Sequence, residues 1–307
     1  MSIKKSKQVH YFDLGASLYT PSTHPALLNR LQHGMTGLRS MVVCLEDAIK
    51  ESELAQALEN LNQALDELQP TPQLKRFIRP RNPQIFEQIL NNKNIHKIDG
   101  FILPKFDLNS LELYKAVLKK QSRIIPIMPT LETPQVFDPQ AMILLAQRLQ
   151  SWRQGIICLR IGGNDLMNIL GIKRMWGFTI YDTPLRGLID QLVIQFRTQG
   201  FELSAPVFDF IDDTETLKKE IALDLAYGFF SKTAIHPIQI PIIEAAFFDF
   251  TQNQLAQAQS VLNKQATAAF KLNGQMMEPS CHQDWARRVV QFAKRYQDSK
   301  AVDFKLK

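Results

Sequence analysis

Short apolar segments rich in β-branched residues recur along the 307-residue chain, and each ends in polar or charged residues. Continuous apolar runs without alternation are typical of parallel strands that are buried on both faces. Eight such segments are present: GASLYTP (15–21), RSMVVCLED (39–47), KRFIRPRN (75–82), DGFILPK (99–105), SRIIPIMPTLET (122–133), QGIICLRIGG (154–163), SAPVFDF (204–210) and AYGFFSKTAIHP (226–237).

Segments with helical periodicity lie between these runs. In ESELAQALENLNQALDEL, Leu54, Leu58, Leu61 and Leu65 recur at spacings of three and four and form one apolar stripe. Strands that alternate with helices indicate βαβ units, and eight parallel strands can close a barrel. We therefore predict an α/β fold, a (β/α)8 TIM barrel. An open doubly wound sheet is the alternative, but no GxGxxG sequence follows the first strand.

The chain continues well beyond the eighth run. Two further helical segments, IPIIEAAFFDFTQNQLAQAQSVLNKQATAAF and EPSCHQDWARRVVQFAKRYQ, are joined by KLNGQMME. A minimal barrel does not need them. We therefore predict a catalytic barrel over residues 1–249 and a C-terminal helical extension over residues 250–307. The extension packs on the barrel itself or on a neighbouring subunit.

The composition argues against a membrane-spanning or secreted protein. No apolar run is long enough to span a bilayer, and the first residues lack the apolar core of a secretory signal. Cys44, Cys158 and Cys281 are far apart and show no CxxC spacing, which indicates reduced thiols. We expect a cytoplasmic protein with no membrane partner.

The formal net charge of +6 admits a nucleic-acid partner. However, the densest basic runs, KKSK and FKLK, lie at the two ends of the chain, where such runs are usually solvated tails. No basic stripe with interleaved aromatic residues is visible. We therefore expect an anionic small-molecule substrate and no nucleic-acid partner.

Carboxylates end two adjacent runs. In a parallel barrel the active site lies at the C-terminal ends of the strands. Glu132 follows the fifth run and Asp165 follows the sixth, so the two could converge on one hard cation, Mg²⁺ or alternatively Mn²⁺. Each could instead cap the helix that follows, and spacing alone leaves both interpretations open.

Cationic residues end the third and fourth runs. Arg79 and Arg81 are two residues apart, so on a strand both would point into the barrel mouth. A guanidinium there can bind a substrate carboxylate or pair with Glu46 and Asp47, which end the second run. Lys105 ends the fourth run and is a further candidate for binding substrate.

The sequence GGN (162–164) follows the sixth run. The backbone N–H groups of Gly163 and Asn164 could bind an oxyanion, although a Gly-Gly pair is also common in tight turns. His236, after the eighth run, is as readily structural as catalytic. The other histidines lack ligand spacing such as HxxxH, so a zinc site is not expected.

These motifs, in this order, resemble those of the citrate lyase β-subunit-like group of the HpcH/HpaI aldolase superfamily. The resemblance runs from about residue 15 to about residue 295. It is carried by SLYTP followed by CLEDAI (44–49), RPRN (79–82), GFILPK (100–105), PTLET (129–133), GGNDL (162–166) and GFFSKTAIHPIQ (228–239).

The resemblance implies a metal-dependent C–C bond lyase or aldolase on a (β/α)8 barrel. It implies that Glu132 and Asp165 hold Mg²⁺ and that Arg79 contacts the carboxylate or carbonyl of the substrate. Glu46 and Asp47 would support that arginine and the water at the metal. The expected reaction is of the retro-aldol or retro-Claisen type, on a 2-oxo or hydroxy acid or its CoA thioester.

Three positions depart from the family pattern. Cys44 replaces the first aspartate of the DLED motif, and Arg81 stands at or near an asparagine. In GQMME (274–278), Glu278 replaces an aspartate that, in members acting on CoA esters, reaches a neighbouring subunit's active site. We therefore expect a homo-oligomer, specifically a trimer, in which Glu278 serves as an acid or base.

Two other function classes stay open at this stage, because fold does not dictate function. One is a CoA-thioester hydrolase or phosphotransferase on the same barrel, although the chain lacks a P-loop. The other is a non-catalytic binding protein.

Overall fold

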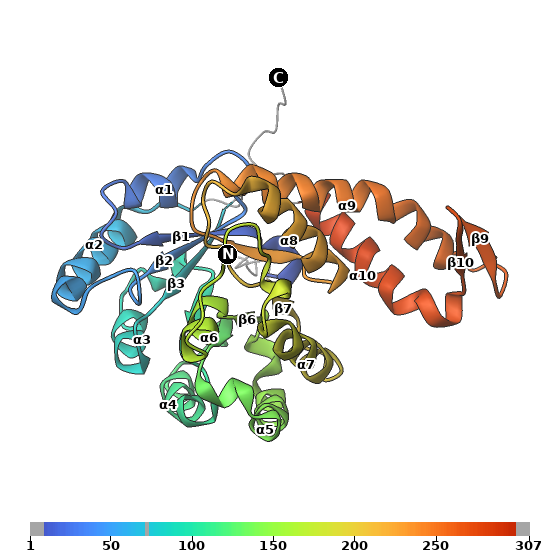
Figure 1. Cartoon of the computed structure of the whole chain (residues 1–307). Coiled ribbons are helices and arrows are strands. Elements are labelled where there is room, and N and C mark those ends of the chain that lie inside the picture. The colour runs from blue at the N-terminus through green and yellow to red at the C-terminus, as the bar shows by residue number, and fades with distance from the viewer. Residues whose placement is uncertain (1–8, 71–73, 299–307) are drawn as a thin grey trace.

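Eight parallel strands form the centre of the molecule, and helices surround them (Figure 1). The computed structural model describes residues 9–70 and 74–298, so the basic runs KKSK and FKLK lie outside the described residues. The strands are β1 (Gly15–Pro21), β2 (Ser40–Cys44), β3 (Lys75–Arg79), β4 (Gly100–Leu103), β5 (Ile127–Leu131), β6 (Leu159–Ile161), β7 (Leu203–Ser204) and β8 (Ser231–Ala234).

The strands follow one another around the sheet in the order of the chain. Each strand from β1 to β6 pairs with the next in sequence, and β8 pairs with β1. Between β7 and β8, a bridge at Ala205 and Lys232 and a hydrogen bond of 2.9 Å from the Ala205 N–H to the Ser231 carbonyl nearly close the ring. The predicted (β/α)8 barrel is confirmed.

Helices follow most strands and cover the outside of the barrel. They are α1 (Leu27–His33), α2 (Leu54–Glu67), α3 (Pro83–Leu90), α4 (Leu108–Lys119), α5 (Pro139–Leu149), α6 (Gly163–Ile169), α7 (Leu185–Arg197), α8 (Thr214–Ala226), α9 (Gln239–Val261) and α10 (Pro279–Asp298). Short 3-10 helices lie at Tyr11–Asp13, Glu51–Glu53, Ile95–Lys97, Pro134–Phe137, Gln150–Gly155 and Ile180–Asp182. None of the described helices combines the length and apolar character needed to cross a bilayer.

Side-chain caps fix where several helices begin. Asn82 accepts a hydrogen bond of 2.9 Å from the Ile85 N–H, and Pro83 occupies the first turn of α3. Asp107, Asp138 and Asp213 cap α4, α5 and α8 in the same manner. Such caps satisfy N–H groups that have no partner inside the helix. They therefore define the ends of the loops that leave the strands.

The seventh strand is shorter than predicted. SAPVFDF (204–210) was expected to form it, but β7 ends at Ser204. Pro206 lacks an N–H group and cannot continue a ladder of backbone hydrogen bonds. Side chains bind the next carbonyls instead: Lys232 Nζ lies 2.9 Å from the Pro206 oxygen and Arg174 Nη2 lies 2.9 Å from the Val207 oxygen.

The segment KLNGQMME, which joins the two predicted C-terminal helices, forms most of a hairpin, and the first of these helices ends earlier than predicted. Helix α9 ends at Val261, and β9 (Phe270–Leu272) pairs with β10 (Gln275–Met277) in antiparallel fashion. Asn273 and Gly274 connect them with φ angles of 50° and 81°, which suits a two-residue hairpin turn. The boundary predicted at 249/250 falls inside α9, and the division into two domains stays a prediction.

Helices α9 and α10 lie side by side, and their hairpin stands away from the barrel (Figure 1). Buried Glu244 of α9 ties both helices to their own barrel. Its carboxylate accepts hydrogen bonds from the Ala16 N–H (2.6 Å) and the Tyr296 hydroxyl (2.6 Å), and it pairs with Arg39 Nε at 2.8 Å. Val261, Val289 and Phe292 of the two helices are buried within the chain, whereas Leu255 and Trp285 are half-buried.

A buried ion network joins β8 to α8. Lys232 Nζ lies 2.9 Å from Glu220 Oε1 and 2.7 Å from Asp224 Oδ2, outside the barrel wall. Arg174 pairs with the other oxygen of Glu220, and the Tyr181 hydroxyl donates to Asp224 at 2.7 Å. Burial raises the pKa of Asp224 to about 6, and Lys232 opposes this shift. The Lys232 ammonium of β8 thus lies outside the mouth.

Replacing Lys232 with Met should lower the free energy of unfolding by about 3–5 kcal/mol, because the buried acids lose a partner. Chemical denaturation of the full chain measures this change. The matched control is Lys218→Met on α8. Lys218 is exposed, and among the described residues its ion pair is with Glu215 at the surface. Its loss should cost no more than about 0.5 kcal/mol. Equal losses for the two variants would contradict a structural role for the network.

Candidate active site at the barrel mouth

A cavity of about 340 Å³ opens at the C-terminal ends of the strands. This is the end at which barrel enzymes place their active sites. Its lining includes Tyr19, Asp47, Arg79, Glu132, Asp165 and Thr233. Polar side chains from strands that are distant in sequence therefore share one hollow.

Arg79, the last residue of β3, lies at the centre of a carboxylate cluster. Its Nη2 atom is 2.8 Å from Glu46 Oε2, 2.9 Å from Glu132 Oε1 and 3.6 Å from Asp47 Oδ2. The predicted pairing with Glu46 and Asp47 is present. In addition, the Nε atom of Arg79 is buried and has no hydrogen-bond partner among the described residues.

Lys105 brings a second cation into the same cluster. Its backbone has a φ angle of 47°, in the left-handed region, and its N–H donates to Glu132 Oε1 at 2.7 Å. Its Nζ atom contacts Asp165 and lies 3.5 Å from Asp47 Oδ2 and 3.6 Å from Glu46 Oε1. A residue held in this strained conformation beside a cavity is more common at functional sites than elsewhere.

The surroundings of Glu46, Asp47 and Glu132 shift the pKa values of these acids in different directions. Burial raises the pKa of Glu46 to about 7, although Arg79 favours its carboxylate. Burial also raises the pKa of Glu132, again against the charge of Arg79. For Asp47, the hydrogen bond with Glu46 and the charge of Lys105 outweigh burial and lower the pKa. Adjacent acids with separated pKa values are suited to different roles in proton transfer.

Gly162, Gly163 and Asn164 form the rim beside Glu132. Gly162 is glycine because a Cβ atom there would collide with the Glu132 side chain. Gly163 begins α6 and would collide with Ile180 if it carried a Cβ atom. Together with Asp165 these residues line the cavity, so the segment predicted from the sequence does reach the mouth.

Glu132 and Asp165 carry carboxylate oxygens, the kind of donor that Mg²⁺ prefers. No group of three or more His, Cys, Asp or Glu side chains in the described part of the chain converges as a ligand set. However, Mg²⁺ is commonly held by one or two carboxylates together with waters and substrate oxygens. The Lys105 ammonium already rests against Asp165, so this position accommodates a positive charge. The donors fit the ion if Lys105 moves aside.

The two-residue spacing predicts that Arg79 and Arg81 point the same way, but in the structure Arg81 points elsewhere. Strand β3 ends at Arg79 and Pro80 follows, so the alternation of a strand does not extend to Arg81. Its guanidinium contacts the Ile49 carbonyl and pairs with Glu51 at 3.0 Å on the neighbouring loop. The prediction that both arginines point into the mouth is therefore wrong for Arg81.

Glu278 and His236 lie apart from the carboxylate cluster. Glu278 precedes α10, directly after the hairpin, and its contacts are with Cys281 and His282. It touches none of the mouth residues of its own barrel among the contacts described. The His236 ring accepts a hydrogen bond from the Ile238 N–H at 3.3 Å, which is a local turn contact.

The sequence argument missed a second arginine in the cavity. Arg160 of β6 is buried and lines the mouth together with Tyr19, Thr130 and Thr233. A signal was present, because Arg160 interrupts the otherwise apolar run ICLRIGG. A charged residue inside a buried strand usually has a partner or a function.

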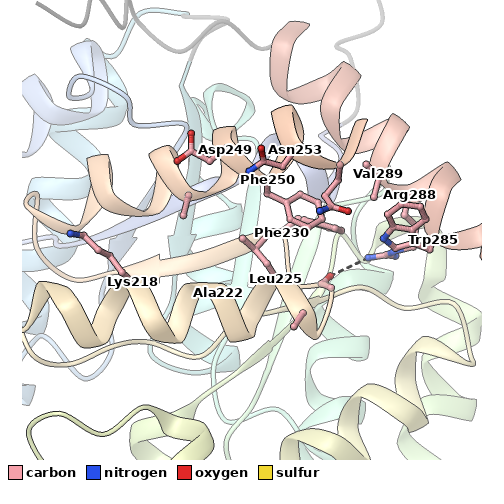
Figure 2. Close-up of a pocket in the computed structure, with 14 residues that line it drawn as sticks. Lys218, Ala222, Leu225, Phe230, Asp249, Phe250, Asn253, Trp285, Arg288 and Val289 are labelled. Carbon is pink, nitrogen blue, oxygen red and sulfur yellow. Dashed lines mark hydrogen bonds between the residues drawn. The ribbon is translucent and has the colours of Figure 1, made fainter. Parts of the chain in front are cut away.

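Another hollow, of about 600 Å³, lies outside the barrel between α8, α9 and α10 (Figure 2). Figure 2 shows Lys218 and Asp249 toward one end and Arg288 toward the other. Arg288 already pairs with Glu202 and donates to the Gly228 carbonyl at 3.2 Å. The charged groups of this outer hollow are dispersed, whereas those of the mouth cavity converge.

Comparison with known proteins gives consistent matches. A citrate lyase subunit beta-like protein of Deinococcus radiodurans is 24% identical over 278 residues, which are 86% of this chain and 92% of that protein. CitE of Mycobacterium tuberculosis, solved with magnesium, acetoacetate and coenzyme A, aligns with a TM-score of 0.65 at 19% identity, over 91% of this chain and 98% of that one.

Two further solved structures share the fold. The citrate lyase beta subunit of M. tuberculosis with oxaloacetate and magnesium aligns with a TM-score of 0.58 at 17% identity, over 77% of this chain and 98% of that one. RipC of Yersinia pestis aligns with a TM-score of 0.56 at 19% identity, over 77% and 96% of the two chains. A family model described as C–C bond lyase of the TIM-barrel fold matches residues 8–297. Since that match spans nearly the whole sequence, the chain belongs to this C–C bond lyase family.

Proposed function

We propose that the protein is a Mg²⁺-dependent lyase that cleaves or forms a C–C bond in a 2-oxo or hydroxy acid or its CoA thioester. The observation that carries the proposal is the carboxylate cluster of Glu46, Glu132 and Asp165 around Arg79 and Lys105 at the barrel mouth. Family membership supports the lyase class, and the relatives solved with magnesium and small oxo acids support the choice of ligands.

Glu132 and Asp165 would hold the ion, with Mn²⁺ as an alternative to Mg²⁺. When bound, a divalent cation supplies Lewis-acid stabilisation of negative charge on substrate oxygens. The four carboxylates outnumber the two cations that touch them, Arg79 and Lys105, by two charges when all are ionised. This imbalance favours entry of a divalent cation.

Arg79 would orient the substrate acid. Two carboxylates hold its Nη2 atom, and the unpartnered Nε atom remains as a buried donor. A guanidinium fixed in this way costs little entropy when it binds a carboxylate or carbonyl oxygen. Gly163 and Asn164 border the same space and would bind a further oxygen.

Glu46 would take the proton in the cleavage direction. As the C–C bond breaks, the hydroxyl becomes a carbonyl and loses its proton to the Glu46 carboxylate. The bonding electron pair moves onto the other fragment as an enolate, whose carbon must then be protonated. A pKa of about 7 suits Glu46 to accept a proton near neutral pH. Asp47, with its lowered pKa, would stay ionised and hold Lys105 and Arg79 in place.

A neighbouring copy of the chain would provide the acid that protonates the enolate. Glu278 directly follows the hairpin, and its contacts are with Cys281 and His282 rather than with its own cavity, which supports a role at an adjacent barrel. We propose a homotrimer on this basis. We also propose a cytoplasmic location, which is supported by three free thiols, two buried and one exposed.

Full-length protein with Mg²⁺ should convert a member of a panel of hydroxy diacids, 2-oxo acids and CoA thioesters into two fragments or their condensation product. Chelation of the metal should abolish the reaction, because charge on the developing enolate would lose its stabilisation. Product analysis by NMR measures this outcome. Release of free thiol without a new C–C fragmentation, or transfer of phosphate, would contradict the lyase proposal.

Replacing Arg79 with Lys should lower kcat/KM by roughly 100-fold or more, because the charge is kept but the planar fork is lost. The matched control is Arg81→Lys, whose guanidinium is directed to Ile49 and Glu51, and it should keep nearly wild-type kcat/KM. The reverse pattern, with Arg81 essential and Arg79 dispensable, would show that the arginine motif is aligned wrongly.

Glu278→Gln and Asp165→Asn variants should each be inactive alone and should recover partial activity when mixed after reversible dissociation, because some sites then combine intact groups from two chains. A mixture of Arg79→Lys with Asp165→Asn is the control and should gain nothing in this way, since both changes lie in one barrel. Light scattering should report a trimer. A monomer, or no recovery in the mixture, would rule out the shared site.

A further inference from the structure

Arg160 is a buried cation without a described carboxylate partner. Its side chain extends from β6 into the barrel, and the residue is 3% exposed. Its polar contacts are neutral: Nη2 lies 2.6 Å from Thr233 Oγ1 and Nη1 lies 3.8 Å from the Met128 sulfur. The guanidinium carbon also lies 5.6 Å from the centre of the Tyr19 ring. In residues 9–70 and 74–298, no carboxylate forms an ion pair with it.

This state is energetically unusual. Arginine stays charged at any pH relevant to proteins, and a buried charge without a counter-charge is costly. Of the other buried arginines, Arg39 pairs with Glu244 and Arg174 pairs with Glu220 and Asp209. Buried Arg76 donates to the Leu31 and Gln69 carbonyls at 2.8 and 2.9 Å. Because Arg160 lines the mouth cavity, a bound anion can supply the missing charge.

Thr130 provides an independent observation at the same place. It is the register partner of Arg160 on the adjacent strand β5 and lines the same cavity. Its hydroxyl is buried and has no hydrogen-bond partner in the described part of the chain. A buried hydroxyl without a partner is uncommon and indicates a ligand or water that completes it.

Thr130 and Arg160 lie one layer below the proposed metal and Arg79 site. Each is two residues before a rim residue, Glu132 on β5 and Gly162 on β6. Two residues along a strand span roughly 6–7 Å. A short acid whose first carboxylate lies at the rim would therefore place a group on its other end near Arg160.

We propose that Arg160 and Thr130 bind a second carboxylate of the substrate, so that the acid processed here is a small dicarboxylic acid. The inference rests on the proposed lyase function for its rim subsite. One guanidinium with neutral hydroxyls offers a single positive charge, which matches a carboxylate better than a doubly charged phosphate. The cavity of about 340 Å³ accommodates an acid of this size.

The test is isothermal titration of full-length protein, in the presence of Mg²⁺, with malate and with lactate. Both acids carry a 2-hydroxy carboxylate, and only malate has a second carboxylate. Wild type should bind malate at least about tenfold more tightly, because a hydrogen bond between charged groups contributes that much. In Arg160→Gln the malate affinity should fall to the lactate value, while lactate affinity stays unchanged.

Two variants guard against a general loss of structure. Arg160→Lys keeps the charge and should retain part of the preference for malate. Arg148→Gln, an exposed arginine of α5 that pairs with Glu112, should retain the whole preference. If wild type binds both acids equally or binds neither, or if Arg160→Gln loses affinity for both, the proposal is overturned and Arg160 is a structural contact of Tyr19 and Thr233.

The readout also separates this inference from the proposed function, because binding requires no turnover. A malate preference that depends on Arg160, in a protein without lyase activity, would keep the dicarboxylate site and remove the lyase. Lyase activity on monocarboxylic acids that is indifferent to Arg160→Gln would keep the lyase and remove the dicarboxylate site.

Discussion

The mouth of the barrel is organised by the ion pairs of Arg79. One guanidinium nitrogen holds Glu46 from the loop after β2 and Glu132 from the end of β5, so three separate segments are fixed against one another. Lys105 adds the loop after β4 and reaches Asp165 at the start of α6. Because Arg79, Glu46 and Glu132 are largely buried, the attraction among them is screened less than at a surface. Removal of any one charge leaves its partners uncompensated, which is why the site behaves as a unit.

The rest of the fold supports this cluster from outside. The loops that carry it enter helices at capped starts, as at Asn82 and Asp107, and their lengths are thereby fixed. The network of Lys232 with Glu220 and Asp224 binds α8 to the wall behind the cavity. One charge cluster thus lies at the mouth of the barrel, and the other lies outside the barrel wall at β8. The outer one is saturated by protein groups, whereas the inner one retains unpartnered donors.

The sequence was sufficient for the fold and for most of the rim. The apolar runs that end in polar residues predicted the positions of the strands. Because Arg79, Glu132 and Asp165 follow such runs, the sequence also predicted that they lie close together at the mouth. The sequence-based predictions were wrong where a strand ends early. Strand β3 ends before Pro80, so strand alternation does not direct Arg81 into the mouth. Strand β7 ends before Pro206 and is shorter than predicted. The Asn-Gly pair at 273–274 is a hairpin signal in the segment predicted only as a connection between two helices, and the structure forms a hairpin there. The left-handed Lys105 could not be read from sequence, since its conformation depends on Glu132 from another strand.

The proposed lyase chemistry depends most on whether Glu132 and Asp165 hold a divalent cation in the place now approached by the Lys105 ammonium. Calorimetric titration of Mg²⁺ into the full chain tests it directly, with Asp165→Asn as the variant and Asp284→Asn, an exposed acid of α10, as the control. We predict one site in wild type and in the control. Asp165→Asn should lose more than about 100-fold in affinity, because a direct ligand matters more than the supporting residues whose loss costs roughly 10- to 100-fold. Equal Mg²⁺ affinity in all three proteins would contradict the claim.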